Sequence, residues 1–102
     1  LLQRTLDVFV IDTTGDVSVA VMIENLRAEG YAVDRAYDQR SMKAQMKAAD
    51  RSGARFALLV GPEELSVGEV TIRDLRSQEF DQTQQRVGQG AVVSAITELL
   101  TK

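Results

Sequence analysis

Basic side chains recur every four residues in one stretch of the chain. Lys43, Lys47 and Arg51 follow this spacing, which places them on one face of a helix. Residues 40–55 hold five basic side chains and one aspartate, a local charge of +4 that leaves −7 for the rest of the chain. Like charges at this spacing repel each other, and exposed faces usually mix both signs. The pattern indicates an anionic partner such as nucleic-acid phosphates, although a solvated outer face would have the same spacing.

Two carboxylates follow the most apolar stretch of the chain, residues 56–60. The sequence Gly61-Pro62-Glu63-Glu64 predicts a tight turn. In open α/β sheets, ligands bind beyond the carboxyl ends of the parallel strands, and carboxylates there can accept hydrogen bonds from the exocyclic amines of bases. A solvated turn is the alternative interpretation.

Arg73 is the donor that could complete such a base-reading pair. It alternates with apolar Val70 and Ile72, so it should face away from them on a strand. A lone arginine on a strand is more commonly a solubility residue. If the carboxylate and the arginine share one edge, Lys47, Glu64 and Arg73 are expected to meet at the same rim of the sheet.

Composition removes many other kinds of chemistry. The chain has 102 residues, 12 basic and 15 acidic side chains, and neither cysteine nor histidine. Thiolate and imidazole metal sites, disulfides and imidazole acid–base catalysis are therefore excluded. The longest nearly unbroken apolar run, residues 17–23, is too short to cross a bilayer. The length fits one domain, and because the sequence begins with Leu1 we expect it to belong to a longer protein.

Strands and helices alternate through the first sixty residues. Strands are expected at residues 6–11, 31–35 and 56–60. The first helix should begin after Asp16 and end at Gly30, and the second should begin after Ser41 and end at Gly53. This order gives right-handed crossovers and a parallel three-stranded core.

The pattern changes after residue 62. Alternation at residues 70–75, with a second polar run containing Phe80, predicts an antiparallel hairpin, and residues 81–90 are interpreted as a weak strand end and a loop. Apolar positions between Val92 and Leu100 predict a closing helix. The expected architecture is an α/β fold with a mixed five-stranded sheet and three helices.

Two nucleotide-related alternatives fit the sequence poorly. Gly88-Gln89-Gly90 resembles the start of a dinucleotide fingerprint, but Val93 occupies the third glycine position. A receiver domain would need an acidic residue at the end of the third strand, where this chain has Val60 and Gly61. A stand-alone nucleotide-binding enzyme therefore has little support.

Three segments together resemble a known family. The motif R-S-x-K-x-Q-x-K-x-A at residues 40–49, the segment G-A-R-F-A at 53–57 and the strand at 68–75 are similar to the C-terminal anticodon-binding domain of class II histidyl-tRNA synthetases. The resemblance covers essentially the whole chain. It implies that residues 1–102 form one anticodon-binding domain of a longer synthetase, with a five-stranded mixed sheet and three helices.

The resemblance also implies site residues. In the wider family, which includes threonyl- and prolyl-tRNA synthetases, the acidic residue of a G-x-x-E turn and a basic residue on the next strand approach anticodon bases; these correspond to Glu64 and Arg73. The loop before the second helix and the basic residues of that helix lie near the tRNA, which implies Gln39, Arg40 and Lys47. We add Lys43, which lies on the same helix face as Lys47.

The implied role is to hold the anticodon stem-loop of tRNA(His). A separate catalytic domain of a histidine–tRNA ligase would use ATP and Mg for histidylation, so this domain is expected to have no catalytic residue, metal or cofactor of its own. The resemblance further implies a homodimeric parent protein in the cytoplasm with no membrane partner. A regulatory or dimerisation module in a tRNA-sensing protein is the alternative, and the sequence upstream of Leu1 would distinguish the two.

Overall fold

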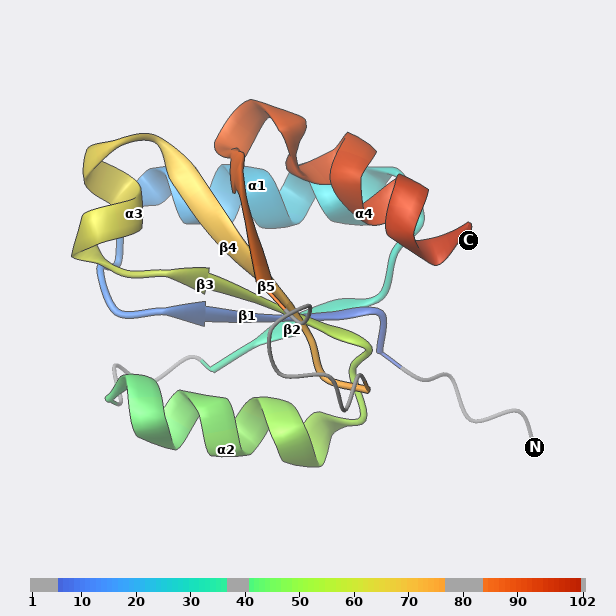
Figure 1. Cartoon of the computed structure of the whole chain (residues 1–102), viewed down its shortest axis with the longest axis horizontal. Coiled ribbons are helices and arrows are strands. Elements are labelled where there is room, and N and C mark those ends of the chain that lie inside the picture. The colour runs from blue at the N-terminus through green and yellow to red at the C-terminus, as the bar shows by residue number, and fades with distance from the viewer. Residues whose placement is uncertain (1–5, 37–40, 77–83, 102) are drawn as a thin grey trace.

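Strand β3 (Phe56–Val60) forms the middle of a five-stranded sheet with the order β2-β1-β3-β4-β5 (Figure 1). The computed structural model describes residues 6–36, 41–76 and 84–101. The other strands are β1 (Val8–Asp12), β2 (Val33–Arg35), β4 (Glu69–Asp74) and β5 (Gln84–Gly88). β1 pairs in parallel with β2 and β3, whereas β4 is antiparallel to both β3 and β5. The sheet is therefore mixed, as predicted.

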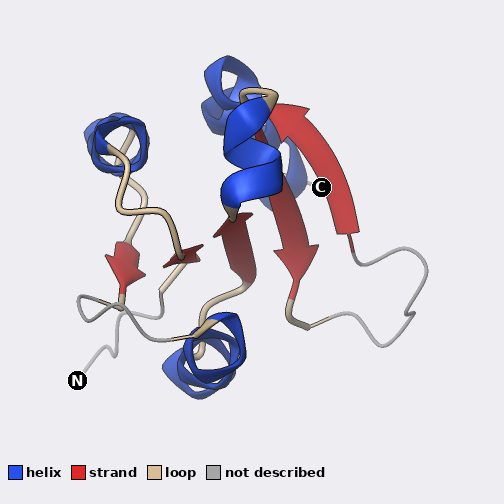
Figure 2. Ribbon diagram, turned by 90° about the vertical axis from the view of Figure 1, so that its left-hand side faces the viewer, coloured by secondary structure: helices blue, strands red, loops and turns tan. Residues whose placement is uncertain are grey.

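Helices cover the two faces of the sheet unequally. Helices α1 (Val17–Ala28) and α4 (Val92–Leu100) lie on one face, and α2 (Met42–Ser52) lies on the other. Helix α2 packs mainly on β1, and none of the described helices covers β4 and β5 on that side (Figure 2). The short helix α3 (Pro62–Ser66) follows the carboxyl end of β3.

Helix boundaries follow local chemistry. The side chains of Asp16 and Ser41 accept hydrogen bonds from the Ser18 and Ala44 amides, so they cap α1 and α2 as the sequence predicts. Gly53 ends α2 with a φ of 78°, in the left-handed region that glycine adopts without steric cost.

The core is built in two layers separated by the sheet. One cluster contains Val8, Leu58 and Ile72 from the strands together with buried residues of α1 and α4. The other is smaller and contains Phe9, Ile11 and Ala57 beneath α2. Val70 and Ile72 point into the first cluster, as their alternation predicts.

Two expectations need correction. The structure has a fourth helix, α3, where a tight turn was expected, because Pro62 at its first position has a φ suited to starting a helix. The second hairpin strand lies at Gln84–Gly88, within the segment interpreted as a weak strand end and a loop, and Phe80 falls outside the described residues. Gln84, Gln85 and Arg86 are exposed on this edge strand, so the apolar alternation that marks a half-buried strand is absent.

Candidate nucleic-acid interface

The carboxyl edge of β1 is held by a buried aspartate. Asp12 is 6% exposed and its Oδ1 accepts hydrogen bonds from the Thr14 amide at 2.8 Å and the Thr14 hydroxyl at 2.6 Å. Its Oδ2 accepts from the Gly15 amide at 3.1 Å and pairs with Arg35 Nη2 at 3.3 Å. These contacts occupy both carboxylate oxygens. Asp12 therefore shapes the turn that leads into α1.

Asp16 follows this turn and caps α1. Its Oδ2 accepts a hydrogen bond from the Ser18 amide at 2.9 Å. Hydrogen bonding with Ser18 favours the charged form and lowers the pKa of Asp16 below its ordinary value. The cap is therefore strongest when the carboxyl is ionised.

Gln45 fixes α2 against the end of β1. Its Oε1 accepts from the Asp12 amide at 3.0 Å, and its Nε2 donates to the Asp12 carbonyl at 2.9 Å. Strand β2 ends at Arg35, which is in register with Val10, so Gln45 bonds the backbone of β1 just beyond the last β2 pairing. Sequence reasoning gave Gln45 no structural role. Its spacing from Met42 and Ala49, on the apolar stripe of α2, is the signal that would have found it.

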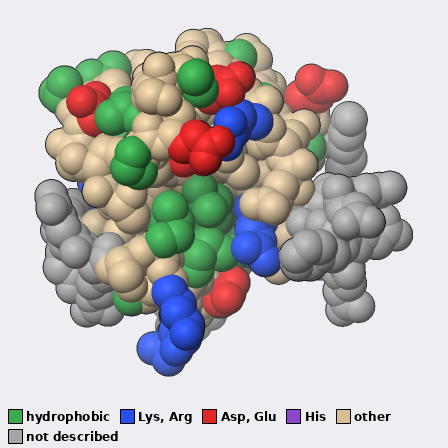
Figure 3. All heavy atoms as spheres, turned by 60° about the vertical axis from the view of Figure 1, so that its left-hand side comes forward, with side chains coloured by type: hydrophobic (Ala, Val, Ile, Leu, Met, Phe, Trp, Pro, Cys, Tyr) green, Lys and Arg blue, Asp and Glu red, His purple; other side chains and the backbone are tan. Residues whose placement is uncertain are grey.

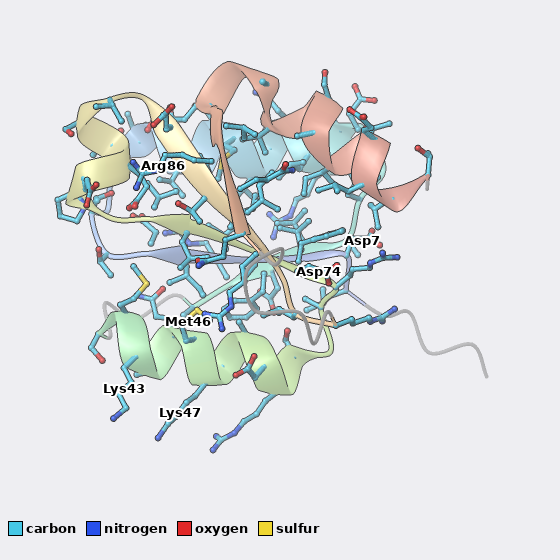
Figure 4. All side chains as sticks on the ribbon, in the orientation of Figure 1. Asp7, Lys43, Met46, Lys47, Asp74 and Arg86 are labelled. Carbon is cyan, nitrogen blue, oxygen red and sulfur yellow. The ribbon has the colours of Figure 1, made fainter. Side chains whose placement is uncertain are left out.

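The basic face of α2 is free to meet an anion. Lys43, Lys47 and Arg51 are all exposed, and Lys43 and Lys47 point away from the sheet while Met46 points toward it (Figure 4). Lys43 lies in the first turn, which contains no acidic residue. A cation there opposes the helix dipole, so this placement does not serve helix stability. A phosphate at this end of α2 would meet both the dipole and the lysine.

Glu64 is held in place from two sides. Its Oε1 accepts a hydrogen bond from the Gly61 amide at 2.7 Å, which caps α3. Its Oε2 pairs with Arg86 Nη2 at 3.1 Å. The side chain of Glu64 is 15% exposed, so the predicted turn carboxylate is a fixed group rather than a freely solvated one.

The expectation that Arg73 pairs with Glu64 at one rim is wrong. β4 runs antiparallel to β3, so Arg73 is in register with Ala57, four residues before Gly61 and about 13 Å away at 3.3 Å per residue. Asp74, the next residue, lies at the opposite end of the strands from Arg86 (Figure 4). Lys47 points away from the sheet, so the three side chains do not converge. Arg86, which sequence reasoning missed, is the partner of Glu64.

A shallow groove lies beside Glu64 and Arg86, on the face of β4 and β5 that none of the described helices covers. It has a volume of about 340 Å³ and is lined by Leu59, Glu64, Thr71, Gln84, Gln85 and Arg86. Arg73 shares this face of the sheet because its register partner Ala57 belongs to the cluster beneath α2. Figure 3 shows an apolar patch on one side of the molecule, with acidic and basic side chains both above and below it. The groove offers the apolar side chain of Leu59 together with hydrogen-bond donors and acceptors, a combination that suits unpaired bases.

Two predicted site residues, Gln39 and Arg40, and the possibility of metal or membrane sites are still to be compared with the structure. Gln39 and Arg40 lie outside the described residues, so their role stays a prediction. Among the residues that the structure describes, no group of three or more acidic side chains could hold a metal ion. In the same part of the chain, no helix has the length and apolarity needed to span a bilayer.

Comparison with known proteins shows which family the chain belongs to. Residues 7–99 match the family model described as "Anticodon binding domain". This chain belongs to the anticodon-binding domain family. The resemblance noted in the sequence and the α/β fold with a mixed five-stranded sheet are thereby confirmed.

Similar proteins are found by both sequence and structure. A histidine–tRNA ligase of Desulforudis audaxviator is 42% identical over 84% of this chain, and one of Neisseria gonorrhoeae is 46% identical over 67%. The matched regions are 20% and 16% of those proteins, so the anticodon-binding domain described here spans about a fifth of their length or less.

Solved structures agree with this assignment. The apo histidyl-tRNA synthetase of S. aureus has a TM-score of 0.76 at 28% identity, covering 92% of this chain and 24% of that protein. The RNA binding domain of threonyl-tRNA synthetase from Cryptosporidium parvum shares the fold, with a TM-score of 0.71 at 15% identity, covering 93% of this chain and 23% of that one.

Proposed function

We propose that this chain is the anticodon-binding domain of a histidine–tRNA ligase and holds the anticodon stem-loop of tRNA(His). The observation that carries the proposal is the face of β4 and β5 that none of the described helices covers, with its groove beside Glu64 and Arg86, in a chain whose family match runs from residue 7 to residue 99. The names of the similar proteins support histidine as the amino acid.

In this proposal the groove binds bases and the basic face of α2 binds phosphates. Unpaired anticodon bases enter the groove, where Leu59 provides apolar contact and Glu64 accepts hydrogen bonds from base amines. Arg73 donates from the same face, further from α3. Lys43 and Lys47, with Gln39 and Arg40 before them, contact phosphates. The footprint is an extended surface rather than the single rim expected from the sequence.

The domain makes and breaks no bond in this scheme. Histidylation would take place in a catalytic domain elsewhere in the parent protein, with ATP and Mg. That parent would be a cytoplasmic homodimer. Holding the anticodon would contribute to selecting the tRNA whose acceptor end the catalytic domain receives.

Hairpin binding measured against salt tests the phosphate contacts. The full chain is titrated by fluorescence anisotropy with a hairpin RNA that carries the tRNA(His) anticodon loop, and with the same hairpin after exchange of one anticodon base. Lys47→Ala should weaken both complexes equally and lower the slope of log K against log salt by about 0.7 to 0.9. Arg27→Ala is the matched control, because Arg27 is exposed on α1 across the sheet. A slope as steep as that of the unmodified chain would refute phosphate contact by Lys47.

The exchanged hairpin tests recognition of bases. The unmodified chain should bind the matched hairpin more tightly than the exchanged one. A chain that binds both hairpins equally would refute anticodon recognition. Dimer formation without hairpin binding would support the alternative of a dimerisation module.

A further inference from the structure

Arg86 gathers three carboxylates at the end of the open groove. Its Nη2 lies 3.1 Å from Glu64 Oε2 and 3.5 Å from Glu63 Oε1, and its Nη1 lies 3.8 Å from Glu69 Oε1. These partners come from α3 and the start of β4, whereas Arg86 belongs to the edge strand β5. In Figure 4 the side chain of Arg86 lies beside α3.

The register of the sheet explains how Arg86 reaches α3. Arg86 is opposite Thr71 on β4, and Thr71 is opposite Leu59 near the end of β3. All three therefore share one face, and the arginine extends across β4 toward the helix that follows β3. Glu69 lies two residues before Thr71 and so shares this face. A long side chain is needed to span this distance.

These contacts orient the Glu64 carboxylate but leave part of its hydrogen-bond acceptor capacity unused. One oxygen takes the Gly61 amide and the other takes the Arg86 guanidinium. A carboxylate has about four acceptor positions, so one on each oxygen is left for other donors. Both Glu64 and Arg86 line the groove, which places an oriented acceptor beside the space where a base would lie.

Fold stability is a weak reason for this arrangement. The side chains of Arg86, Glu63 and Glu69 are 39%, 80% and 37% exposed, and exposed ion pairs contribute little to folding. Orientation of the one mostly buried member, Glu64, is the effect with a consequence for binding.

We propose that Arg86 is a positioning residue for base recognition, holding the Glu64 carboxylate in the orientation that accepts a hydrogen bond from an anticodon base. The inference rests on the proposed function. Arg86 acts through Glu64, and its contribution should disappear once Glu64 has lost its charge.

A double-mutant cycle tests this dependence. Matched and exchanged hairpins are titrated against the unmodified chain, Glu64→Gln, Arg86→Ala and the double variant, with Arg27→Ala as the control for loss of one positive charge. Both single variants should lower the ratio of matched to exchanged affinity by about 5-fold to 150-fold, and the double variant should fall no further than the more severe single variant. An unchanged ratio in Arg86→Ala, or losses that multiply in the double variant, would overturn the positioning role.

A measurement without RNA separates this inference from the proposed function. The Gly61 amide reports on the Glu64 carboxylate that caps it, so its NMR shift and hydrogen-exchange rate should change in Arg86→Ala in the same direction as in Glu64→Gln. An unchanged Gly61 amide would overturn the positioning of Glu64 by Arg86 whatever the hairpins show. If the unmodified chain did not discriminate between hairpins, the proposed function would fail, while a changed Gly61 amide would still establish that Arg86 orients Glu64.

Discussion

Replacement of Gln45 by methionine should loosen α2 from the sheet. Gln45 is fully buried and makes two hydrogen bonds to the backbone of Asp12, at 3.0 and 2.9 Å. Methionine has a similar shape but restores neither bond, and it leaves a buried amide and a buried carbonyl unpaired. Each of the two unpaired groups costs about 1 to 3 kcal/mol, so the free energy of unfolding should fall by roughly 2 to 6 kcal/mol.

Urea unfolding followed by far-UV circular dichroism measures this loss. The midpoint should fall while the m-value is preserved, and the melting temperature should drop by at least about 8 °C, because 1 kcal/mol corresponds to roughly 4 to 8 °C in a domain of this size. Lys43→Met is the matched control: it places the same side chain at an exposed position of α2 and should change stability by no more than about 0.5 kcal/mol. A Gln45→Met variant within about 1 kcal/mol of the unmodified chain would refute the reasoning, because the bridge to Asp12 would then not hold the helix.

Three further changes have defined outcomes. Hydrogen bonding lowers the pKa of Asp16 in the folded chain, so the contribution of its carboxylate to stability should be complete above the ordinary aspartate pKa and be lost as pH falls through the lowered pKa. Asp16→Asn keeps an acceptor for the Ser18 amide but has no charge, so it should remove this part of the acid transition in thermal melts recorded across pH. A pH profile identical to that of the unmodified chain would contradict the role of the charge. Gly53→Ala should lower the free energy of unfolding in urea by about 1 kcal/mol, because φ is 78° at this residue. Gly90→Ala is the control and should be nearly neutral, because that position has open space around it and no positive φ. Equal losses of stability in the two variants would contradict the strain argument. Arg73→Ala should weaken discrimination between hairpins by about 1 to 3 kcal/mol if Arg73 reads a base, and equal weakening of matched and exchanged hairpins in the anisotropy assay would assign it to phosphate contact instead.

Local sequence chemistry was sufficient for most of the helices and strands. Asp16 and Ser41 cap their helices through bonds to amides two or three residues away, so their roles depend on neighbours in the chain. The apolar run at 56–60 became the central strand with the bounds that its composition predicted. Exposure of Lys43 and Lys47 likewise follows from helical periodicity.

The edge of the sheet could not be predicted in the same way. β5 has polar residues at most positions, and it is a strand because its backbone pairs with β4, a contact between distant parts of the chain. The partner of Glu64 was misassigned for a related reason. Arg73 and Arg86 lie 9 and 22 residues from Glu64, and only the antiparallel register shows that the more distant one is in contact.

The sequence by itself determined where α1, α2 and α4 begin, which strand is most buried, which helix face is basic and which family the chain resembles, because each depends on residue type and spacing along the chain. Only the tertiary structure decided that Gln45 bonds the end of β1, that Arg86 holds Glu64 and that none of the described helices covers one face of β4 and β5. These features depend on strand register and on how far each helix extends over the sheet, which are set by packing between segments that lie far apart in the chain.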